Sequence, residues 1–343
     1  FLKRKQVVIS VQTYLIDALG AMAFGLFASL LIGTIFGTLG EKTGVVIFTT
    51  IAGYAKSATG AALGVSIAYA LKAPTLVLFS AATVGIAGNE LGGPVGALVA
   101  TIIAAELGKI VSKETPVDIL VTPGVTIISG ILAAQFVGPG VSAFMTAFGN
   151  LVKTATVMQP LFMGILVSAL IGIALTLPIS SAAICIMLSL DGLAGGAATA
   201  GCCAQMVGFA VLSFCENKWG GLLAQGLGTS MLQMGNIVKN PRIWIAPILT
   251  SAITGPLATC LFKLQMNGTP VSSGMGTCGF VGQIGVYTGW MNDIATGTKT
   301  AVTGWDWAGL LLISFILPAI LCPLINMFIR KLGWVKDGDM TLS

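Results

Sequence analysis

WGGLLAQGLGTSMLQMGN, residues 219–236, is an uncharged apolar segment that is interrupted by glycines and carries the polar side chains Gln225, Thr229, Ser230, Gln233 and Asn236. A helix that only crosses a membrane needs neither these breaks nor these amides. Glycine-interrupted helices in transporters free backbone groups to hold a solute. Irregular backbone at membrane depth persists only where protein buries it or where it lines a water-filled cavity. The segment therefore predicts a re-entrant hairpin beside a polar solute site.

A second glycine-rich segment repeats part of the first. The sequence Gly-Leu-Gly-Thr-Ser at residues 226–230 is echoed by Gly-Met-Gly-Thr-Cys at residues 274–278, and further glycines follow as far as Gly285. Interrupted apolar segments in corresponding places are typical of transporters whose binding site lies between repeats. We therefore predict a second re-entrant hairpin at residues 273–289, which contributes Thr277 and Gln283 to the solute site.

The composition of the chain is that of a membrane protein. Of its 343 residues, 55% are hydrophobic and only 8% are charged, whereas soluble domains carry about 25% charged residues. About 20 apolar residues cross a bilayer core, and several charge-free runs reach that length: 18–40, 119–152, 154–190, 192–215 and 307–329. The sequence predicts an all-α polytopic membrane protein, in contact with membrane lipid. The net charge of +5 does not indicate nucleic-acid binding.

The apolar segments form two halves of five spans each, which gives about ten transmembrane helices. The N-terminal half, residues 1–140, is a scaffold with spans near 15–38, 44–71, 73–89, 92–110 and 119–138. Lys56 interrupts the second of these, so that span is either a broken helix or one that turns Lys56 towards a partner. The C-terminal half, residues 159–343, holds both hairpins and spans near 159–177, 179–191, 193–215, 243–265 and 305–329.

An amphipathic helix is expected at residues 141–158, between the two halves. Its apolar face consists of Phe144, Phe148, Leu151, Val152 and Ala155. A helix with one apolar face lies in the membrane interface rather than across the bilayer.

The basic residues predict which side of the membrane each loop faces, because cytoplasmic loops are enriched in Lys and Arg. With the N-terminus inside, the cytoplasmic ends hold most of them: Lys3, Arg4, Lys5, Lys72, Lys109, Lys113, Lys218, Lys239, Arg242, Arg330, Lys331 and Lys336. The outer ends hold Lys42, Lys153, Lys263 and Lys299. Both termini are therefore expected on the cytoplasmic side of the membrane.

Ionisable groups inside a bilayer are costly, so each is a candidate site residue. Glu216 and Asn217 immediately precede the first hairpin, and Gln205 lies three turns earlier. A carboxylate and amides that converge on one cavity suit a hydroxyl-rich ligand. The alternative is that this loop anchors the protein in the interface, with Lys218 and Trp219 at headgroup level.

Asn89 and Glu90 lie in a polar break, GNELGGPVG at residues 88–96, between two short apolar runs. The break either dips into the membrane and contributes to the solute site, or forms an outer turn with a solvated carboxylate. Glu106 and Lys109, three residues apart near a predicted helix end, are expected to pair.

No catalytic or metal site is predicted. The chain has no histidine, its seven cysteines fall in or beside apolar segments, and no C-x-x-C pair occurs. Metal binding through nitrogen and sulfur ligands is therefore not expected. No Walker A or G-x-S-x-G motif is present either, and we expect no cofactor.

Three long motifs resemble those of one family: GNELGGPVGALVATIIAAELGKIVSK at 88–113, LPISSAAICIMLSLDGLAGGAATAGCCAQMVGFAV at 177–211 and GGLLAQGLGTSMLQMGNIVKNPRIWIAP at 220–247. They resemble the PfoR-like branch of the bacterial phosphotransferase-system enzyme IIC membrane proteins, over nearly the whole chain. The resemblance implies a homodimer in which the N-terminal halves meet and the C-terminal halves carry the substrate. It also implies phosphoryl transfer by separate IIA and IIB proteins, which makes this chain a permease subunit without catalytic residues of its own.

The resemblance has one gap. Sugar-transporting members of the related glucose superfamily place a glutamate and a histidine at the sugar, so here only Glu216 or Glu90 can fill the carboxylate role. We expect a transport subunit for a sugar or a related small polar solute that works by alternating access. The alternatives are a membrane sensor or regulator that keeps the fold without phosphorylation-coupled transport, bound to a regulatory protein, and a transporter of a non-sugar solute.

Overall fold

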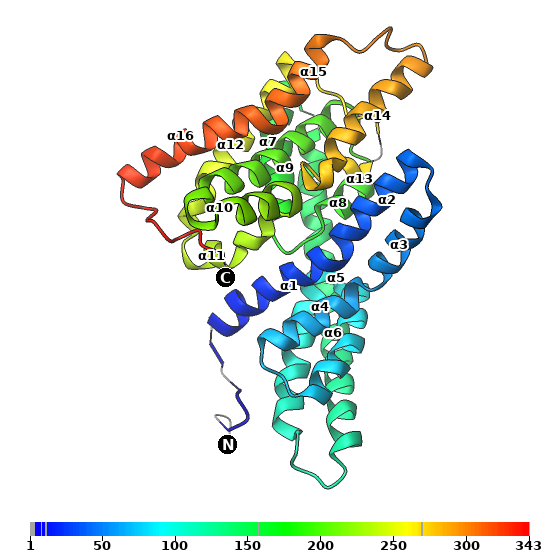
Figure 1. Cartoon of the computed structure of the whole chain (residues 1–343), viewed down its shortest axis with the longest axis vertical. Coiled ribbons are helices and arrows are strands. Elements are labelled where there is room, and N and C mark those ends of the chain that lie inside the picture. The colour runs from blue at the N-terminus through cyan, green and yellow to red at the C-terminus, as the bar shows by residue number, and fades with distance from the viewer. Residues whose placement is uncertain (1–3, 8, 11, 157, 269, 343) are drawn as a thin grey trace. The chain divides into compact units, whose positions relative to one another are not determined.

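The computed structural model describes residues 4–7, 9–10, 12–156, 158–268 and 270–342. All the elements found among these residues are helices. The α-helices are α1 (Ala18–Leu26), α2 (Ile32–Thr43), α3 (Val46–Ser57), α4 (Thr59–Ala70), α5 (Thr75–Val111), α6 (Asp118–Thr156), α7 (Pro160–Thr176), α8 (Ser181–Met187), α9 (Gly192–Leu212), α10 (Phe214–Leu223), α11 (Met234–Lys239), α12 (Ile245–Pro256), α13 (Pro270–Ser273), α14 (Val281–Ala295), α15 (Gly304–Leu311) and α16 (Leu317–Lys331). Figure 1 shows them in chain order from blue to red.

Shorter helical turns of other types join several of these helices. The π-helical turns are η1 (Gln12–Asp17), η2 (Phe27–Leu31), η3 (Ala224–Gly228), η6 (Leu257–Leu261) and η8 (Leu312–Ile316). The 3₁₀ turns are η4 (Ser230–Gln233), η5 (Pro241–Trp244) and η7 (Cys278–Phe280). The chain divides into two compact units, Phe1–Thr146 and Ala147–Ser343, which are described separately below.

Six helical stretches of the described residues are long and apolar enough to cross a membrane. They are Gln12–Thr43, Thr75–Val111, Asp118–Thr156, Gly192–Leu212, Pro241–Leu261 and Gly304–Lys331. The protein is therefore an all-helical chain with several candidate spans, in keeping with the predicted class.

In the first unit, α5 reverses direction in its middle. Gly92 and Gly93 leave the helical region, and Gly93 has φ 60° and ψ −160°, a conformation open essentially only to glycine. Pro94 then starts the second arm, where its fixed φ suits a first helical turn. A Cβ on Gly88 would lie 2.7 Å from Ala97 Cα, so the two arms run back along each other. The polar break predicted at residues 88–96 is therefore a tight turn between antiparallel arms.

The predicted span at 44–71 is a broken helix, one of its two alternatives, whereas the predicted amphipathic helix is not a separate element. The span predicted at 44–71 is interrupted at Ala58, between α3 and α4, and Lys56 is exposed near the end of α3. The amphipathic helix predicted at 141–158 is the continuation of α6, which runs unbroken to Thr156, and Val157 lies outside the described residues. Its residues Phe144 and Leu151 are exposed, whereas Val152 and Ala155 are buried.

The second unit is built around α9. This helix packs against α7, α12 and α16 (Figure 1), and nearly all of its residues are buried. Its small residues explain this burial, because helices in lipid associate through close backbone contact. A Cβ on Gly201, for example, would lie 1.9 Å from the carbonyl oxygen of Ser168 in α7.

The prediction of a membrane-crossing helix at residues 179–191 is wrong. The only helix there is α8, with seven residues, and at 1.5 Å per residue it is about 10 Å long. The backbone turns after it, with positive φ at Ser189 and Gly192. Hydropathy alone does not register these turns, which is why the apolar run was mistaken for a span.

Candidate functional site

The two glycine-rich segments predicted as hairpins meet in the second unit. The first runs through α10 and η3, breaks at Thr229 (φ −159°, ψ 142°) and resumes in η4 and α11. The second breaks between α13 and α14, where Gly276, Gly279 and Phe280 all have positive φ. The Thr277 hydroxyl of the second segment donates to the carbonyl oxygen of Gly226 in the first. The two echoed pentapeptides are thus in direct contact.

Glycine is required where the second segment crosses α9. Gly276 has φ +52°, and a Cβ there would lie 2.7 Å from Cys202 Cβ. Further along the same segment, the Gln283 amide nitrogen lies 3.3 Å from Cys203 Sγ on α9. The Gln283 side-chain oxygen is buried and has no hydrogen-bond partner among the described residues. A buried acceptor without a donor is costly unless a ligand or water satisfies it.

The amides of the first segment form a chain of hydrogen bonds. Asn236 donates to Gln233 Oε1 over 2.8 Å, and Gln233 donates to Gln225 Oε1 over 2.9 Å. Gln225 in turn donates to the Ser213 hydroxyl over 2.8 Å and to the Gly221 carbonyl over 3.0 Å. All of these amides are buried. Each bond fixes the orientation of the next side chain, so the chain presents one defined pattern of donors and acceptors.

A strap formed by residues 335–342 lies across this amide chain and the start of α10 (Figure 1). The Glu216 carboxylate accepts the Gly338 amide at 3.0 Å and the Met340 amide at 2.9 Å, one on each oxygen. Asn217 donates to the Met340 carbonyl and accepts the Leu342 amide, both at 2.8 Å. The polar groups predicted to receive a solute thus bind the chain's own backbone.

The strap is also held at its other contacts. The amide nitrogens of Gln233 and Asn236 donate to the carbonyls of Met340 and Thr341, both over 2.9 Å. The Met340 side chain is fully buried. The Arg330 guanidinium lies 3.7 Å from the Glu216 carboxylate, whose side chain is 10% exposed. The carboxylate is therefore almost completely enclosed and compensated.

Gln205 belongs to a second buried network, between α7, α9 and α12. Its side-chain oxygen accepts the Trp244 indole N–H at 2.9 Å and the Thr176 hydroxyl at 3.2 Å. Thr176 is also 2.7 Å from the Ser230 hydroxyl, at the break of the first segment. The Gln205 amide nitrogen donates to Ser251 over 3.4 Å. This network ties the broken segment to the central helix.

The comparison with protein families identifies the chain. Residues 16–342 match the family model described as phosphotransferase system, EIIC, and this range includes both glycine-rich segments and all of the strap. The chain belongs to the phosphotransferase-system EIIC family. As an EIIC protein it is a membrane transport subunit of the phosphotransferase type, which works with IIA and IIB partners on a solute. No curated protein and no solved structure matches the chain.

The site residues predicted for this EIIC protein fall into three groups. Around the strap and the amide chain lie Glu216, Asn217, Gln225, Gln233 and Asn236. Around the contact of the broken segments and α9 lie Gln205, Thr229, Ser230, Thr277 and Gln283. Asn89 and Glu90 belong to the first unit, at the turn of α5, where Glu90 is exposed and Asn89 is half-buried.

Sequence reasoning missed several residues of these networks. Thr176, Ser213 and Ser251 are isolated hydroxyls in apolar helices, and Trp244 provides the indole donor. A polar residue inside a charge-free run was the available signal for the three hydroxyls. The strap gave no signal, because it contributes backbone groups. Among the described residues no cluster of His, Cys, Asp or Glu has the make-up of a metal site.

Proposed function

We propose that this EIIC protein carries a sugar or a related polyhydroxylated solute across the bacterial plasma membrane by alternating access. The observation that supports this most is the contact between Thr277 and Gly226, which joins two broken segments beside buried amides and a carboxylate. In this proposal both segments are re-entrant hairpins. Phosphoryl transfer to the solute is supplied by separate IIA and IIB proteins.

The chemistry of the Glu216 cluster suits a polyol. A carboxylate accepts two donors, and two neighbouring amides both accept and donate, which matches hydroxyl groups that do the same. The strap places N–H donors on both carboxylate oxygens at 2.9 and 3.0 Å, where sugar hydroxyls would bind. In the proposed mechanism a solute displaces the strap, and Gln283 supplies an additional acceptor at the second segment.

Orientation and assembly are part of the same proposal. In the second unit the basic residues of the expected cytoplasmic side lie near the strap, with Arg330 beside Glu216 and Arg242 5.4 Å from the Trp334 ring. Lys299, expected outside, pairs instead with Asp306 at 2.7 Å. We propose that the strap lies in the cytoplasm, together with both termini, as the distribution of basic residues along the sequence predicts. We propose that the protein is a homodimer through its first unit, and that Asn89 and Glu90 line the solute path.

A sensor function of the PfoR type is the second candidate. The strap favours it, because a solute that displaces residues 335–342 would expose them, and they could then bind a regulatory protein in the cytoplasm. The absence of a histidine at the proposed site is also consistent with a fold that senses a solute without coupling to its phosphorylation.

Equilibrium binding to the purified full chain tests the transport proposal. Thermal shifts would be measured with a panel of sugars, sugar phosphates and non-sugar solutes, for the wild type, Glu216→Gln and Glu41→Gln. A solute at a hundredfold excess over its Kd stabilises the folded state by about 2.7 kcal/mol. We expect a sugar to stabilise the wild type and the Glu41→Gln control but not Glu216→Gln. Glu41 is a suitable control because its side chain is exposed, in the last turn of α2.

A silent sugar panel, or an equal shift in Glu216→Gln, would contradict this proposal. Uptake into vesicles that contain the partner IIA and IIB proteins separates transport from sensing. Binding without uptake, together with release of the strap, would favour the sensor.

A further inference from the structure

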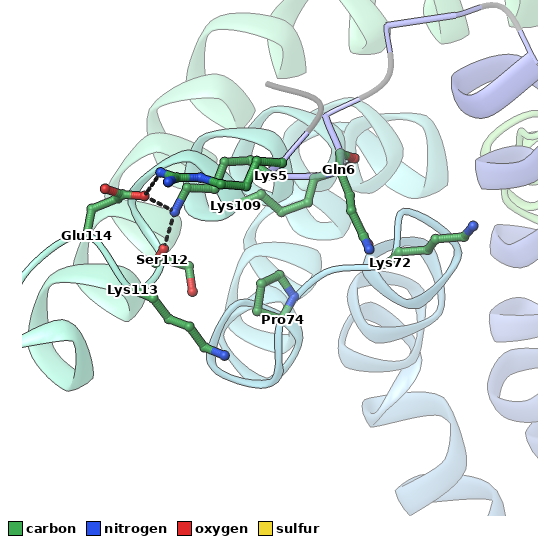
Figure 2. A pocket seen from close by; sticks show the side chains of 9 residues that line it. Lys5, Gln6, Lys72, Pro74, Lys109, Ser112, Lys113 and Glu114 are labelled. Atoms are coloured by element: carbon green, nitrogen blue, oxygen red, sulfur yellow. Dashed lines mark hydrogen bonds and ion pairs between the residues drawn. The ribbon is translucent and has the colours of Figure 1, made fainter. Parts of the chain in front are cut away.

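The basic ends of helices in the first unit enclose a cavity. It measures about 540 Å³, within the range of small-ligand sites. Its lining consists of Arg4, Lys5, Gln6, Lys72, Pro74, Lys109, Ser112, Lys113 and Glu114. Figure 2 shows that these side chains come from the N-terminal segment, from the loop after α4, and from the end of α5 with the loop that follows it. The polar surface is thus dominated by cations.

The charges of the cavity do not cancel. Glu114 pairs with Arg4 at 2.8 Å and with Lys5 at 2.5 Å. Lys109 is saturated by Glu106 and by the carbonyls of Gln6 and Leu71. The remaining acid close by, Asp118, accepts the Lys113 backbone amide at 2.6 Å. Five cations against these three acids leave two positive charges in excess, which is more than enough to neutralise the single negative charge of a phosphodiester.

Two lysines of the lining, Lys72 and Lys113, leave their ammonium groups open to a ligand. No salt bridge or hydrogen bond of either ammonium group is found among the described residues, and both side chains are exposed. In Figure 2 neither is joined to another residue of the cavity. An excess of positive charge around one cavity favours an anion there, because an opposite charge stabilises the charged form of each cation.

The backbone supplies an independent observation. Gln6, Lys72 and Lys113, all in the lining, have φ of 55°, 55° and 60°. Lys72 follows the end of α4, where Ala73 N bonds Ala68 O and Lys72 N bonds Tyr69 O, a helix ending in which glycine is the usual residue. Strained backbone of this kind gathers at ligand sites, where the surroundings enforce it. Here lysines stand where glycine would be free of strain.

We propose that this cavity binds a phosphate group, and that its natural source is the headgroup of an anionic phospholipid. Basic pockets between membrane helices hold such headgroups. Exposed apolar residues close to the cavity in sequence suit the acyl chains: Tyr69 before Lys72, and Val117, Ile119 and Leu120 after Glu114. The site does not involve the solute site of the second unit and does not depend on transport.

Binding to the purified full chain in neutral detergent tests the proposal. The probes are dihexanoylphosphatidylglycerol, dihexanoylphosphatidylcholine, glycerol 3-phosphate and inorganic phosphate. The test variant is Lys72→Asn with Lys113→Asn, because asparagine tolerates a left-handed backbone. The control, Lys42→Asn with Lys239→Asn, removes the same charge at exposed lysines outside the cavity.

We expect the wild type and the control to bind phosphatidylglycerol at least about tenfold more tightly than the test variant binds it. Phosphatidylcholine should bind weakly to all three. Equal affinity of glycerol 3-phosphate and phosphatidylglycerol would support the phosphate site and assign it to a soluble source. Equal binding of both lipids to the wild type, or unchanged binding in the test variant, would overturn the proposal. Unfolding midpoints of both variants show whether each is folded.

Discussion

The Glu216 cluster of the second unit and the basic cavity of the first unit differ in how their polar groups are satisfied. Around Glu216, each carboxylate oxygen and each amide already has a partner within the chain, mostly on the strap. In the cavity, the ammonium groups of Lys72 and Lys113 have no salt bridge or hydrogen bond among the described residues, and the backbone of both lysines is strained. A ligand at the first site must displace protein, whereas a ligand at the second completes it.

This difference predicts the largest effect for removal of the Glu216 carboxylate. Glu216→Ala leaves the Gly338 and Met340 amides and the Arg330 guanidinium without their acceptor. Hydrogen bonds to a charged group contribute about 1.5 kcal/mol or more each, so we expect a loss of about 3 kcal/mol and release of the strap. Thermal unfolding and the rate of tryptic cleavage after Lys336 measure both effects.

Glu41→Ala is the matched control for this substitution, because its side chain is exposed at the end of α2 and does not touch the strap. Cleavage at an unchanged rate in Glu216→Ala would show that Glu216 does not hold the strap.

Two glutamines sharpen the comparison within the second unit. Gln233→Leu removes three good hydrogen bonds, to Gln225, Met340 and Asn236, and should cost about 2 kcal/mol or more. Gln283→Leu removes only one contact to a cysteine sulfur, and the Gln283 oxygen is already unpartnered. This substitution should lower the free energy of unfolding by less than about 1 kcal/mol, because it also removes a buried acceptor that has no partner.

Denaturation midpoints compare the two leucine variants, and solute binding then separates their roles. Gln283→Leu should abolish solute binding while the protein stays stable. A Gln283→Leu variant that loses as much stability as Gln233→Leu would show that Gln283 serves packing rather than a ligand.

Features that depend on particular side chains could be predicted from the sequence, whereas features that depend on backbone groups could not. The glycine pattern predicted interrupted helices in both segments, and the helices are interrupted there, at Thr229 and at Gly276, of which Gly276 has the positive φ that favours glycine. The pairing of Glu106 with Lys109 was likewise predicted from spacing and is confirmed.

The strap could not be predicted, because it binds through backbone groups that every sequence possesses. The span expected at 179–191 failed for a related reason, since its hydropathy is that of a membrane helix but its backbone turns. The basic cavity was predicted in part. The sequence assigned its lysines to one side of the membrane, but the reversal of α5 at Gly93 is what brings the two ends of that helix to one cavity.

The strain in the basic cavity predicts a smaller effect of opposite sign. Lys72→Gly should stabilise the protein by about 1 kcal/mol, because glycine adopts a positive φ without the penalty that other residues meet. The same change should weaken binding of phosphatidylglycerol. Lys239→Gly, in the last turn of α11, is the comparison, because there glycine lacks this advantage and should destabilise. Equal effects of the two substitutions would contradict the strain at Lys72.

The smallest effect concerns the pH dependence of the cavity. The hydrogen bond from Lys5, and the charges of Lys5 and Arg4, lower the pKa of Glu114 below its ordinary value of 4.5. Because the folded-state pKa is the lower one, the contribution of Glu114 to stability is fully present above pH 4.5 and disappears as the pH falls through the lowered pKa. The difference in unfolding midpoint between the wild type and Glu114→Gln should therefore be constant above about pH 5.5 and shrink below pH 4.5.

Glu114 is a surface group, so 0.5 M salt should reduce the difference at every pH. A difference that grows as the pH falls would mean that the carboxylate is not held by these cations, and the count of two excess charges in the cavity would have to be revised.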